Sequence, residues 1–334
     1  METIKKQNNS PLKEINIMDI GGFKVGHAQD EIGMTGVTVI LCDETAPAGV
    51  DIRGGGPASR ETPLLAPTAD AKGIHALLLS GGSAFGLDAA GGVMRYLEER
   101  NIGFDTGVTK VPLVCQSSLF DLRIGDMKAR PDQAMGYQAC ENASTKPMEQ
   151  GNVGAGTGCT VGKIKGAEHC MKSGIGAYAV QVGELKVGAI VAVNALGDIF
   201  DIDTGKQIAG LLDDENRLAS SEEALYNIVK RPTNLFTGNT TIGAILTNAR
   251  MDKTAMNKIA SMAHNGYARA IRPVHTMADG DSIYALSLGD VVSDINAVGT
   301  LSAYVMAKAI VSGVRAAKGA CGLLAARDLE QNKA

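Results

Sequence analysis

The sequence predicts an α/β protein in which stacked β-sheets are flanked by helical layers. Apolar strand-like runs alternate along the chain with helical segments. Two neighbouring runs have the pattern of an antiparallel hairpin. The 334 residues are 45% hydrophobic, which allows a large buried core in one domain or in two closely associated ones. The 41 glycines among these runs suit close backbone packing.

The first half of the chain supplies strands, a loop and helices. The run GVTVIL at 36–41 is rich in β-branched residues and predicts a strand, as does the apolar run at 75–79. Between them, 51–65 contains three glycines and two prolines, so we expect an irregular loop. Apolar residues at helical spacing predict a helix at 84–100, and a second helix is expected at 133–142.

The second half of the chain alternates strand and helix after a polar excursion. Two apolar runs, 175–182 and 187–193, predict the hairpin. Residues 201–238 are polar and charged, which predicts a surface segment with a short helix at 222–229 that Pro232 ends. The remaining strands and helices are expected at 240–247, 253–270, 282–288 and 295–317.

Composition and charge exclude several classes of partner. The net charge is −4 and the basic residues are scattered, so we expect no binding to nucleic acid or to an anionic membrane. The first twenty residues lack the apolar core of a secretory signal. The apolar span of the last helix, at 295–317, is too short and too rich in alanine and glycine to indicate a membrane-spanning helix. We therefore expect a cytoplasmic protein.

The motifs of metal, nucleotide and serine-triad chemistry are incomplete. The six cysteines form no C-x-x-C pair and have no histidine at ligand spacing, so we expect buried reduced thiols and no zinc, disulfide or cofactor. The segment GGSAFG at 81–86 lacks the last glycine of a nucleophile elbow, which leaves Ser83 structural or substrate-facing. The segment 154–163 lacks the first glycine of a phosphate loop. Of the five histidines, His275 alone lies near the candidate site described next.

The junction TGNTT at 237–241 suggests a different chemistry. A small polar turn precedes a strand that starts with Thr240 and Thr241, and such a junction can be strained. A threonine hydroxyl can attack the preceding carbonyl, and hydrolysis of the resulting ester leaves threonine with a free amine that serves as the base for its own hydroxyl. The alternative is that threonine stands here as a strand former and asparagine as a turn residue.

Six segments favour the first interpretation. They are RGGGPASRETPLL (53–65), LSGGSAFGLDAAGGV (79–93), GNVGAGTG (151–158), VNALGD (193–198), GNTTIGAILTNARM (238–251) and RPVHTMADGDSIYAL (272–286). Together they resemble the DmpA-type P1 peptidase family, which includes L-aminopeptidase/D-esterases, β-peptidyl aminopeptidases and the 6-aminohexanoate-oligomer endohydrolases, or nylon hydrolases. The match runs from about residue 20 to residue 324.

The resemblance implies an N-terminal-nucleophile-like fold, a four-layer αββα sandwich, that forms a single catalytic domain over 1–334. It implies one internal cut between Asn239 and Thr240, which would give an α-chain of 1–239 that stays with a β-chain of 240–334. Because members of the family form large assemblies, we expect a homo-oligomer of four or more subunits. The expected activity is hydrolysis of amide bonds in small peptides or in oligoamides such as 6-aminohexanoate oligomers.

By the same resemblance, Thr240 is the nucleophile, and Asp279 and Asp281 hold and polarise its amine and hydroxyl. Carboxylates suit this role because they stabilise the ammonium that appears during attack. From the residues alone, the D-G-D stretch would be an ordinary turn. The aminopeptidase members have a serine nucleophile supported by serine and glutamate, whereas this chain has threonine and two aspartates. It is therefore expected nearer the nylon-hydrolase branch.

Three further residues are implied by the resemblance. Asn194 matches an asparagine that donates to the oxyanion, where a preorganised amide contributes a few kcal/mol. Lys163 matches a lysine near the active site of the nylon-hydrolase branch. Tyr137 matches a tyrosine near the oxyanion in the aminopeptidase branch.

Three alternatives to an amidase that cuts within oligoamides stay open. The first is an exo-acting aminopeptidase, or β-peptidyl aminopeptidase with esterase activity, that recognises a free substrate amine. The second is a self-processing acyltransferase of the ornithine acetyltransferase kind, whose motifs are not seen in this sequence. The third is a non-catalytic binding protein whose chain stays intact.

Overall fold

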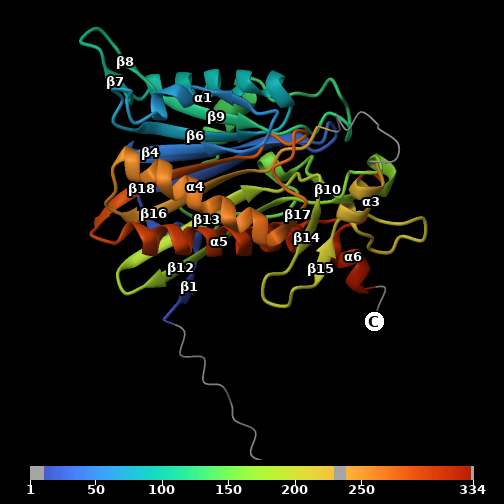
Figure 1. Cartoon of the computed structure of the whole chain (residues 1–334). Coiled ribbons are helices and arrows are strands. Elements are labelled where there is room, and N and C mark those ends of the chain that lie inside the picture. The colour runs from blue at the N-terminus through green and yellow to red at the C-terminus, as the bar shows by residue number, and fades with distance from the viewer. Residues whose placement is uncertain (1–10, 229–237, 332–334) are drawn as a thin grey trace, which may run out of the picture.

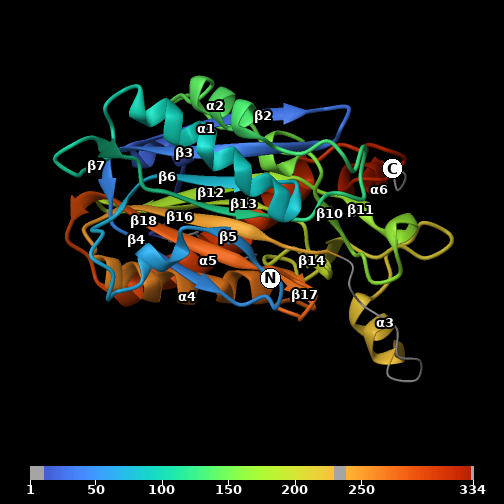
Figure 2. The same ribbon diagram turned by 90° about the horizontal axis from the view of Figure 1, so that it is seen from above.

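The computed structural model describes residues 11–228 and 238–331. They form four layers, whose elements are labelled in Figure 1 and whose order, helices, sheet, sheet and helices, is seen from top to bottom in Figure 2. Helices α1 (Ala89–Glu98) and α2 (Gln133–Glu141) cover one sheet, and helices α4 (Lys253–Ala270) and α5 (Ile295–Ala316) cover the other. The predicted α/β class and αββα sandwich are confirmed.

The upper sheet has five strands, which pair antiparallel except for β6 and β9. In spatial order the strands are β2 (Phe23–Asp30), β3 (Thr35–Ala46), β6 (Ile74–Ser80), β9 (Val114–Ser118) and β5 (Ala58–Arg60). The lower sheet has six strands, which pair antiparallel except for β16 and β18. In spatial order they are β1 (Lys13–Ile15), β12 (Ile175–Val182), β13 (Leu185–Ala192), β16 (Ile242–Ala249), β18 (Ser282–Val291) and β4 (Ala48–Ile52).

Smaller elements connect these layers within the described residues. Strands β7 (Phe104–Asp105) and β8 (Lys110–Val111) form one pair, and β10 (Thr160–Val161) and β11 (Met171–Lys172) form another. A three-stranded sheet has the order β15 (Gln207–Ala209), β14 (Asp198–Phe200) and β17 (Ile271–Arg272). The short helices are α3 (Ser221–Ile228) and α6 (Ala326–Gln331). Single 3-10 turns lie at Ile17–Ile20, Thr62–Leu65, Ser83–Asp88, Gly154–Gly156 and Ala167–His169.

Alternation along the central strands produces two cores. In β16, Ile242, Ala244 and Leu246 face the layer between the two sheets, whereas Ile245 faces helices α4 and α5. Both faces of the strand are therefore buried from Ile242 to Leu246, which explains why the sequence is apolar without alternation over these residues. A third apolar cluster lies between the upper sheet and helices α1 and α2.

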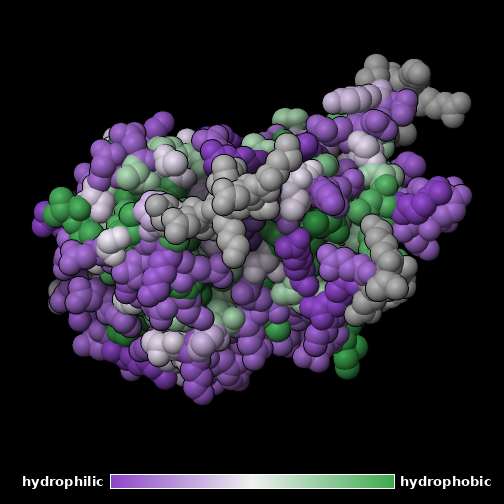
Figure 3. All heavy atoms as spheres, turned by 90° about the horizontal axis from the view of Figure 1, so that it is seen from below, coloured by the Kyte–Doolittle hydropathy of each residue, from purple (hydrophilic) through white to green (hydrophobic). Residues whose placement is uncertain are grey.

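Helix α5 is a core helix of this structure. Among the described residues it is the one helix long and apolar enough to cross a membrane by length and composition, but 67% of its most apolar 18-residue window is buried inside the protein. It packs against α4 and strand β12. The outer face seen from below is mostly hydrophilic (Figure 3).

The sequence predicted the second half of the fold more closely than the first. The hairpin is β12 and β13, paired antiparallel as expected, and the predicted helix at 253–270 is α4. Two expectations need correction, because the loop at 51–65 contains strand β5, and the helix expected at 84–100 starts as a 3-10 turn and becomes α-helical only at Ala89. The helix predicted at 222–229 matches α3, with Val229 outside the described residues.

The cysteines follow the expectation with one exception. Five of them are buried and unbridged, whereas Cys321 is exposed and also unbridged. The prediction that all six are buried is therefore wrong for Cys321, which lies in a turn between α5 and α6.

Candidate active site

Parallel pairing of β16 with β18 brings the two candidate catalytic segments together. In this register Ile242 lies opposite Ser282. Thr240 and Thr241 come directly before β16, and Asp279 and Asp281 come directly before β18. Because parallel strands begin at the same edge of a sheet, the NTT and ADGD segments lie side by side there, and Asn239 forms a parallel bridge with Asp279.

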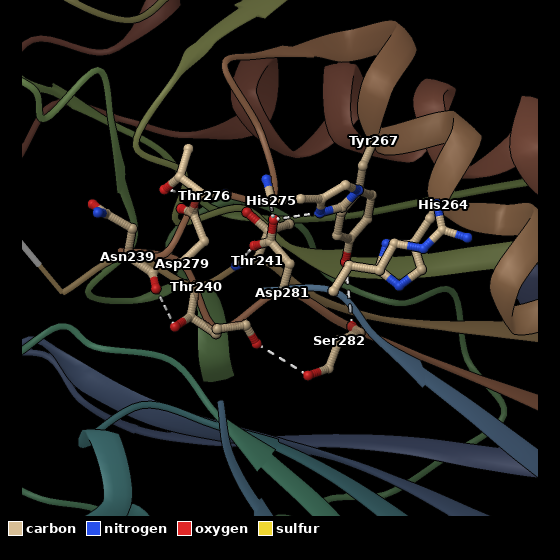
Figure 4. Close-up of polar contacts among 12 residues, drawn as sticks. Asn239, Thr240, Thr241, His264, Tyr267, His275, Thr276, Asp279, Asp281 and Ser282 are labelled. Atoms are coloured by element: carbon tan, nitrogen blue, oxygen red, sulfur yellow. Dashed lines mark hydrogen bonds and ion pairs between the residues drawn. The ribbon is translucent and has the colours of Figure 1, made fainter. Parts of the chain in front are cut away.

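Thr240 is held against the carbonyl group that precedes it. Its side-chain hydroxyl donates to the Asn239 carbonyl oxygen (Figure 4). That oxygen also accepts a hydrogen bond of 3.0 Å from the backbone N–H of Gly280. The backbone N–H of Thr240 donates to the Asn194 carbonyl oxygen at 2.9 Å. The residue is only 4% exposed, so its hydroxyl is confined next to the Asn239–Thr240 peptide bond.

The ADGD turn places two buried carboxyl groups around this peptide bond. One oxygen of Asp281 accepts from the Thr241 N–H at 2.9 Å. One oxygen of Asp279 accepts from the Thr276 N–H at 2.8 Å and from the Thr276 hydroxyl at 2.6 Å. Burial, with a further contribution from the nearby charge of Asp281, raises the pKa of Asp279 above its usual range.

Gly280 is required at the centre of this turn. A Cβ atom at this position would lie 2.6 Å from the Thr240 hydroxyl oxygen and 2.7 Å from the Gly56 carbonyl oxygen. Any other residue would therefore push the turn away from Thr240. The role of Gly280 is not apparent in the sequence, where D-G-D is an ordinary turn.

The triple glycine 54–56 supports the same turn from the other side. The backbone N–H of Gly56 donates to the Asp279 carbonyl oxygen at 2.8 Å. A Cβ on Gly54 would lie 2.4 Å from the Asp279 carbonyl oxygen and from the Asp281 nitrogen. The RGGGP motif thus allows a close backbone contact with the ADGD turn. Three consecutive glycines are the feature of the sequence that could have indicated such a contact, although they were interpreted as an irregular loop.

Lys163 and Asn194 form a buried pair next to Thr240. The Lys163 ammonium donates to the Asn194 side-chain oxygen at 2.7 Å and to its carbonyl oxygen at 3.1 Å. Because the Thr240 N–H donates to the same carbonyl oxygen, the ammonium and the Thr240 nitrogen share one acceptor. Burial lowers the pKa of Lys163 to about 8. The Asn194 amide donates at 2.9 Å to the Phe120 carbonyl oxygen.

The structure does not bring Tyr137 to this cluster. Tyr137 lies on α2, in the upper helical layer, and its hydroxyl donates to Glu99 at 2.6 Å. Its ring packs edge-on against Tyr96, and the Arg95 guanidinium lies over its face at 4.5 Å. The prediction that Tyr137 lies near the oxyanion is therefore wrong for this chain, because the helix directs this side chain toward α1.

The described residues contain no group of three or more histidine, cysteine or acidic side chains that could hold a metal ion. The polar groups around Thr240 are instead backbone N–H groups, two carboxyl groups, an amide and an ammonium. This set can activate a hydroxyl and stabilise an oxyanion through hydrogen bonds.

Comparison with known proteins shows the family of the chain. The family model for peptidase family S58 matches residues 16–326. The chain belongs to peptidase family S58. It is 37% identical to an uncharacterized aminopeptidase of Mycobacterium tuberculosis, over 94% of this chain and 97% of that protein. It is also 32% identical to a 6-aminohexanoate-oligomer endohydrolase of Agromyces sp., over 84% of this chain and 76% of that protein. This member of peptidase family S58 is a hydrolase that acts on amide bonds.

Solved structures share the fold of this S58 peptidase. The L-aminopeptidase D-Ala-esterase/amidase of Ochrobactrum anthropi, described as a variant of the Ntn hydrolase fold, has a TM-score of 0.71 and 18% identity and covers 95% of this chain and 92% of its own. A β-aminopeptidase of a Burkholderia species has a TM-score of 0.66 and 19% identity and covers 90% of this chain and 86% of its own. These likenesses confirm the N-terminal-nucleophile-like fold.

Proposed function

We propose that this S58 peptidase cuts its own backbone between Asn239 and Thr240 and then uses Thr240 as the nucleophile of amide hydrolysis. The single observation that carries the proposal is the contact of the Thr240 hydroxyl with the Asn239 carbonyl group, whose oxygen also accepts from the Gly280 N–H. The nucleophile, the scissile carbonyl group and an oxyanion donor are already together in the intact chain.

The self-cleavage balances with water as the only co-reactant. The Thr240 hydroxyl oxygen bonds to the Asn239 carbonyl carbon, and the Gly280 N–H stabilises the negative charge that develops on the oxygen. The carbon–nitrogen bond then breaks, the hydroxyl proton is transferred to the leaving nitrogen, and an ester remains. Water hydrolyses the ester, so Asn239 ends in a carboxylate and Thr240 regains its hydroxyl with a free amine.

After the cut, the new amine of Thr240 acts as the base for the Thr240 hydroxyl. The amine starts beside the Asn194 carbonyl oxygen, which it shares with the Lys163 ammonium. A nearby positive charge disfavours protonation of the amine, which keeps it available as a base near neutral pH. The Asp279 and Asp281 carboxylates stabilise the ammonium that forms during attack, and the second hydrogen of the Asn194 amide is available to the substrate oxyanion.

The two chains would stay associated, as one protomer of a homo-oligomer. Strands β16 and β18 of the β-chain pair with each other and lie between β13 and β4 of the α-chain in one sheet. Breaking one peptide bond leaves all of these strand pairs intact. Mass spectrometry under denaturing conditions would give two chains, whereas size-exclusion chromatography would give one assembly of several protomers.

The substrates we propose are small peptides or oligoamides such as 6-aminohexanoate oligomers. The similarity to the Agromyces endohydrolase supports oligoamides, and the similarity to the mycobacterial aminopeptidase supports the exo-acting alternative. Assays on linear 6-aminohexanoate oligomers with free and acetylated amino ends distinguish the two. An exo-acting enzyme loses activity on the acetylated oligomer, whereas an endo-acting enzyme keeps it.

Two neighbouring threonines provide the test of the nucleophile. Thr240→Ala should give an intact and inactive chain, because a methyl group cannot attack. The matched control Thr241→Ala should still yield a β-chain that begins at Thr240. Mass spectrometry and N-terminal sequencing measure both. A wild-type chain that stays intact yet hydrolyses amides, or a β-chain that begins elsewhere, would refute the proposal.

A further inference from the structure

His275 binds the Asp281 carboxylate through two donors. The backbone N–H of His275 lies 3.2 Å from one oxygen of Asp281, and its ring Nδ1 lies 2.9 Å from the same oxygen. A carboxylate oxygen accepts hydrogen bonds, so we assign the ring hydrogen to Nδ1. The other Asp281 oxygen accepts from Thr241, next to the nucleophile. Asp281 is 1% exposed, and its orientation is thus fixed from both sides (Figure 4).

The backbone of His275 adopts an uncommon conformation that makes this double contact. Its φ angle is +60°, in the left-handed region that is uncommon for residues other than glycine. In this conformation the backbone N–H and the ring of one residue reach the same oxygen atom. Such local strain persists where the surrounding structure enforces it, and it occurs preferentially at functional sites.

Helix α4 holds the His275 ring in place. The Tyr267 ring is stacked on it with 5.9 Å between centroids, and the His264 ring packs edge-on at 4.7 Å. Burial lowers the pKa of His264 to about 4, so that this ring is neutral at neutral pH. Its Nε2 lies 2.9 Å from the Asp51 carbonyl oxygen. His275 is therefore fixed by aromatic packing on one side and by Asp281 on the other.

We infer that His275 is a positioning residue that orients the Asp281 carboxylate toward the Thr240 and Thr241 backbone during self-cleavage and hydrolysis. The inference rests on the proposed function, since it assigns His275 an action through a carboxylate that supports Thr240. His275 itself contacts Asp281 and the α4 rings rather than the Thr240 hydroxyl.

Two substitutions separate the donor from the backbone conformation. Glycine accepts a φ of +60° without strain, so His275→Gly removes the ring donor while the backbone N–H can stay in place. Asparagine also tolerates this region and carries an N–H donor as many bonds from Cα as Nδ1. With activity expressed per cleaved chain, His275→Gly should lower kcat by about 10-fold to 100-fold with little change in KM. His275→Asn should restore most of that loss.

A double substitution tests whether His275 acts through Asp281. In an Asp281→Asn background, His275→Gly should lower kcat much less than it does in the wild type, because the charge that His275 orients is gone. Asn101→Gly, a remote change at another residue of positive φ, is the matched control and should leave kcat unchanged.

Wild-type kcat in His275→Gly, or an equal loss in both backgrounds, would overturn the role of His275. Failure of the proposed function would appear separately, as an intact wild-type chain or as hydrolysis by Thr240→Ala. A variant that fails to fold would show a lowered Tm. His275→Asn then provides the decisive comparison, because a wild-type Tm with most of the kcat restored is expected only if the side-chain donor matters.

Discussion

Replacing Lys163 with methionine should stabilise the intact chain while it removes activity. Lys163 is 6% exposed, and burial lowers its pKa from 10.5 to about 8. Both of its acceptors have another donor, because the Asn194 side-chain oxygen also accepts from the Thr160 N–H and the Asn194 carbonyl oxygen also accepts from the Thr240 N–H. Methionine fills a similar volume and leaves neither acceptor unpaired.

The size of the effect follows from the pKa. A drop from 10.5 to about 8 corresponds to about 3 kcal/mol at about 1.4 kcal/mol for each pH unit, and this penalty on the folded state is fully present below pH 8. As the pH rises from 8 toward 10.5, the folded chain loses this proton before the unfolded chain does, so the penalty falls to about 1 kcal/mol by pH 10. The gain from Lys163→Met should shrink in the same way.

The assay is denaturant unfolding of intact chains that carry Thr240→Ala, so that all variants have the same covalent structure. The free energy of unfolding is compared with and without Lys163→Met at pH 7 and pH 10, where the contributions of titratable groups remote from Lys163 cancel in the difference. Lys165→Met is the control, since Lys165 is exposed two residues away and should change the free energy by less than about 0.5 kcal/mol.

A double variant that is less stable than Thr240→Ala alone at pH 7 would refute the reasoning, and so would a difference that does not change with pH. If the gain is observed, the wild type keeps a buried ammonium at a cost in stability, which is the pattern of a functional group. In the chain that keeps Thr240, Lys163→Met should then lower kcat by about 100-fold.

Three further predictions concern the turn and the chemistry. Asp281→Asn should lower kcat by about 100-fold in cleaved protein, with little change in Tm, and near-normal turnover would return the D-G-D stretch to an ordinary turn. Gly280→Ala should slow self-cleavage, because its Cβ would lie 2.6 Å from the Thr240 hydroxyl oxygen. The control Gly56→Ala, whose Cβ would have its nearest contact at 3.7 Å, should cleave at the normal rate in a time course followed on gels. Equal rates for the two variants would contradict this steric argument. Added chelator should leave kcat unchanged, and a loss that zinc restores would exclude the proposed chemistry.

The elements that the sequence predicted well are those whose side chains follow a simple period. Helix α4 begins after Asp252, whose side chain accepts from the Ala255 N–H at 2.8 Å, and its buried residues recur at helical spacing.

Strand β9 was missed because it buries polar side chains. Gln116 donates to the Gly86 carbonyl oxygen at 2.6 Å, and the Ser117 hydroxyl lies 2.8 Å from the Tyr284 hydroxyl. Polar groups that find partners only in the fold give no apolar pattern.

The candidate site likewise contains residues that could be predicted from the sequence and contacts that could not. Thr240, Asp279 and Asp281 were predicted from the resemblance, whereas hydrophobic periodicity alone favours a strand start and a turn at these positions. The contacts of Gly280 and His275 could not be predicted, because they depend on the register between β16 and β18 and on the left-handed backbone at His275. Tyr137 was misplaced because a matching residue type on a helix does not determine which neighbour its side chain faces.

The burial of Thr240 also suggests why the cut comes first under the proposed function. In the intact chain the Gly280 N–H is occupied by the carbonyl oxygen of Asn239, and Thr240 is 4% exposed. An external amide would have to reach the same donor and the same hydroxyl at once. Only after the Asn239–Thr240 bond breaks can the Asn239 carbonyl group move away from Gly280 and leave its place to the carbonyl group of a substrate. The first peptide bond that the site cleaves is therefore the one that prevents it from cleaving any other.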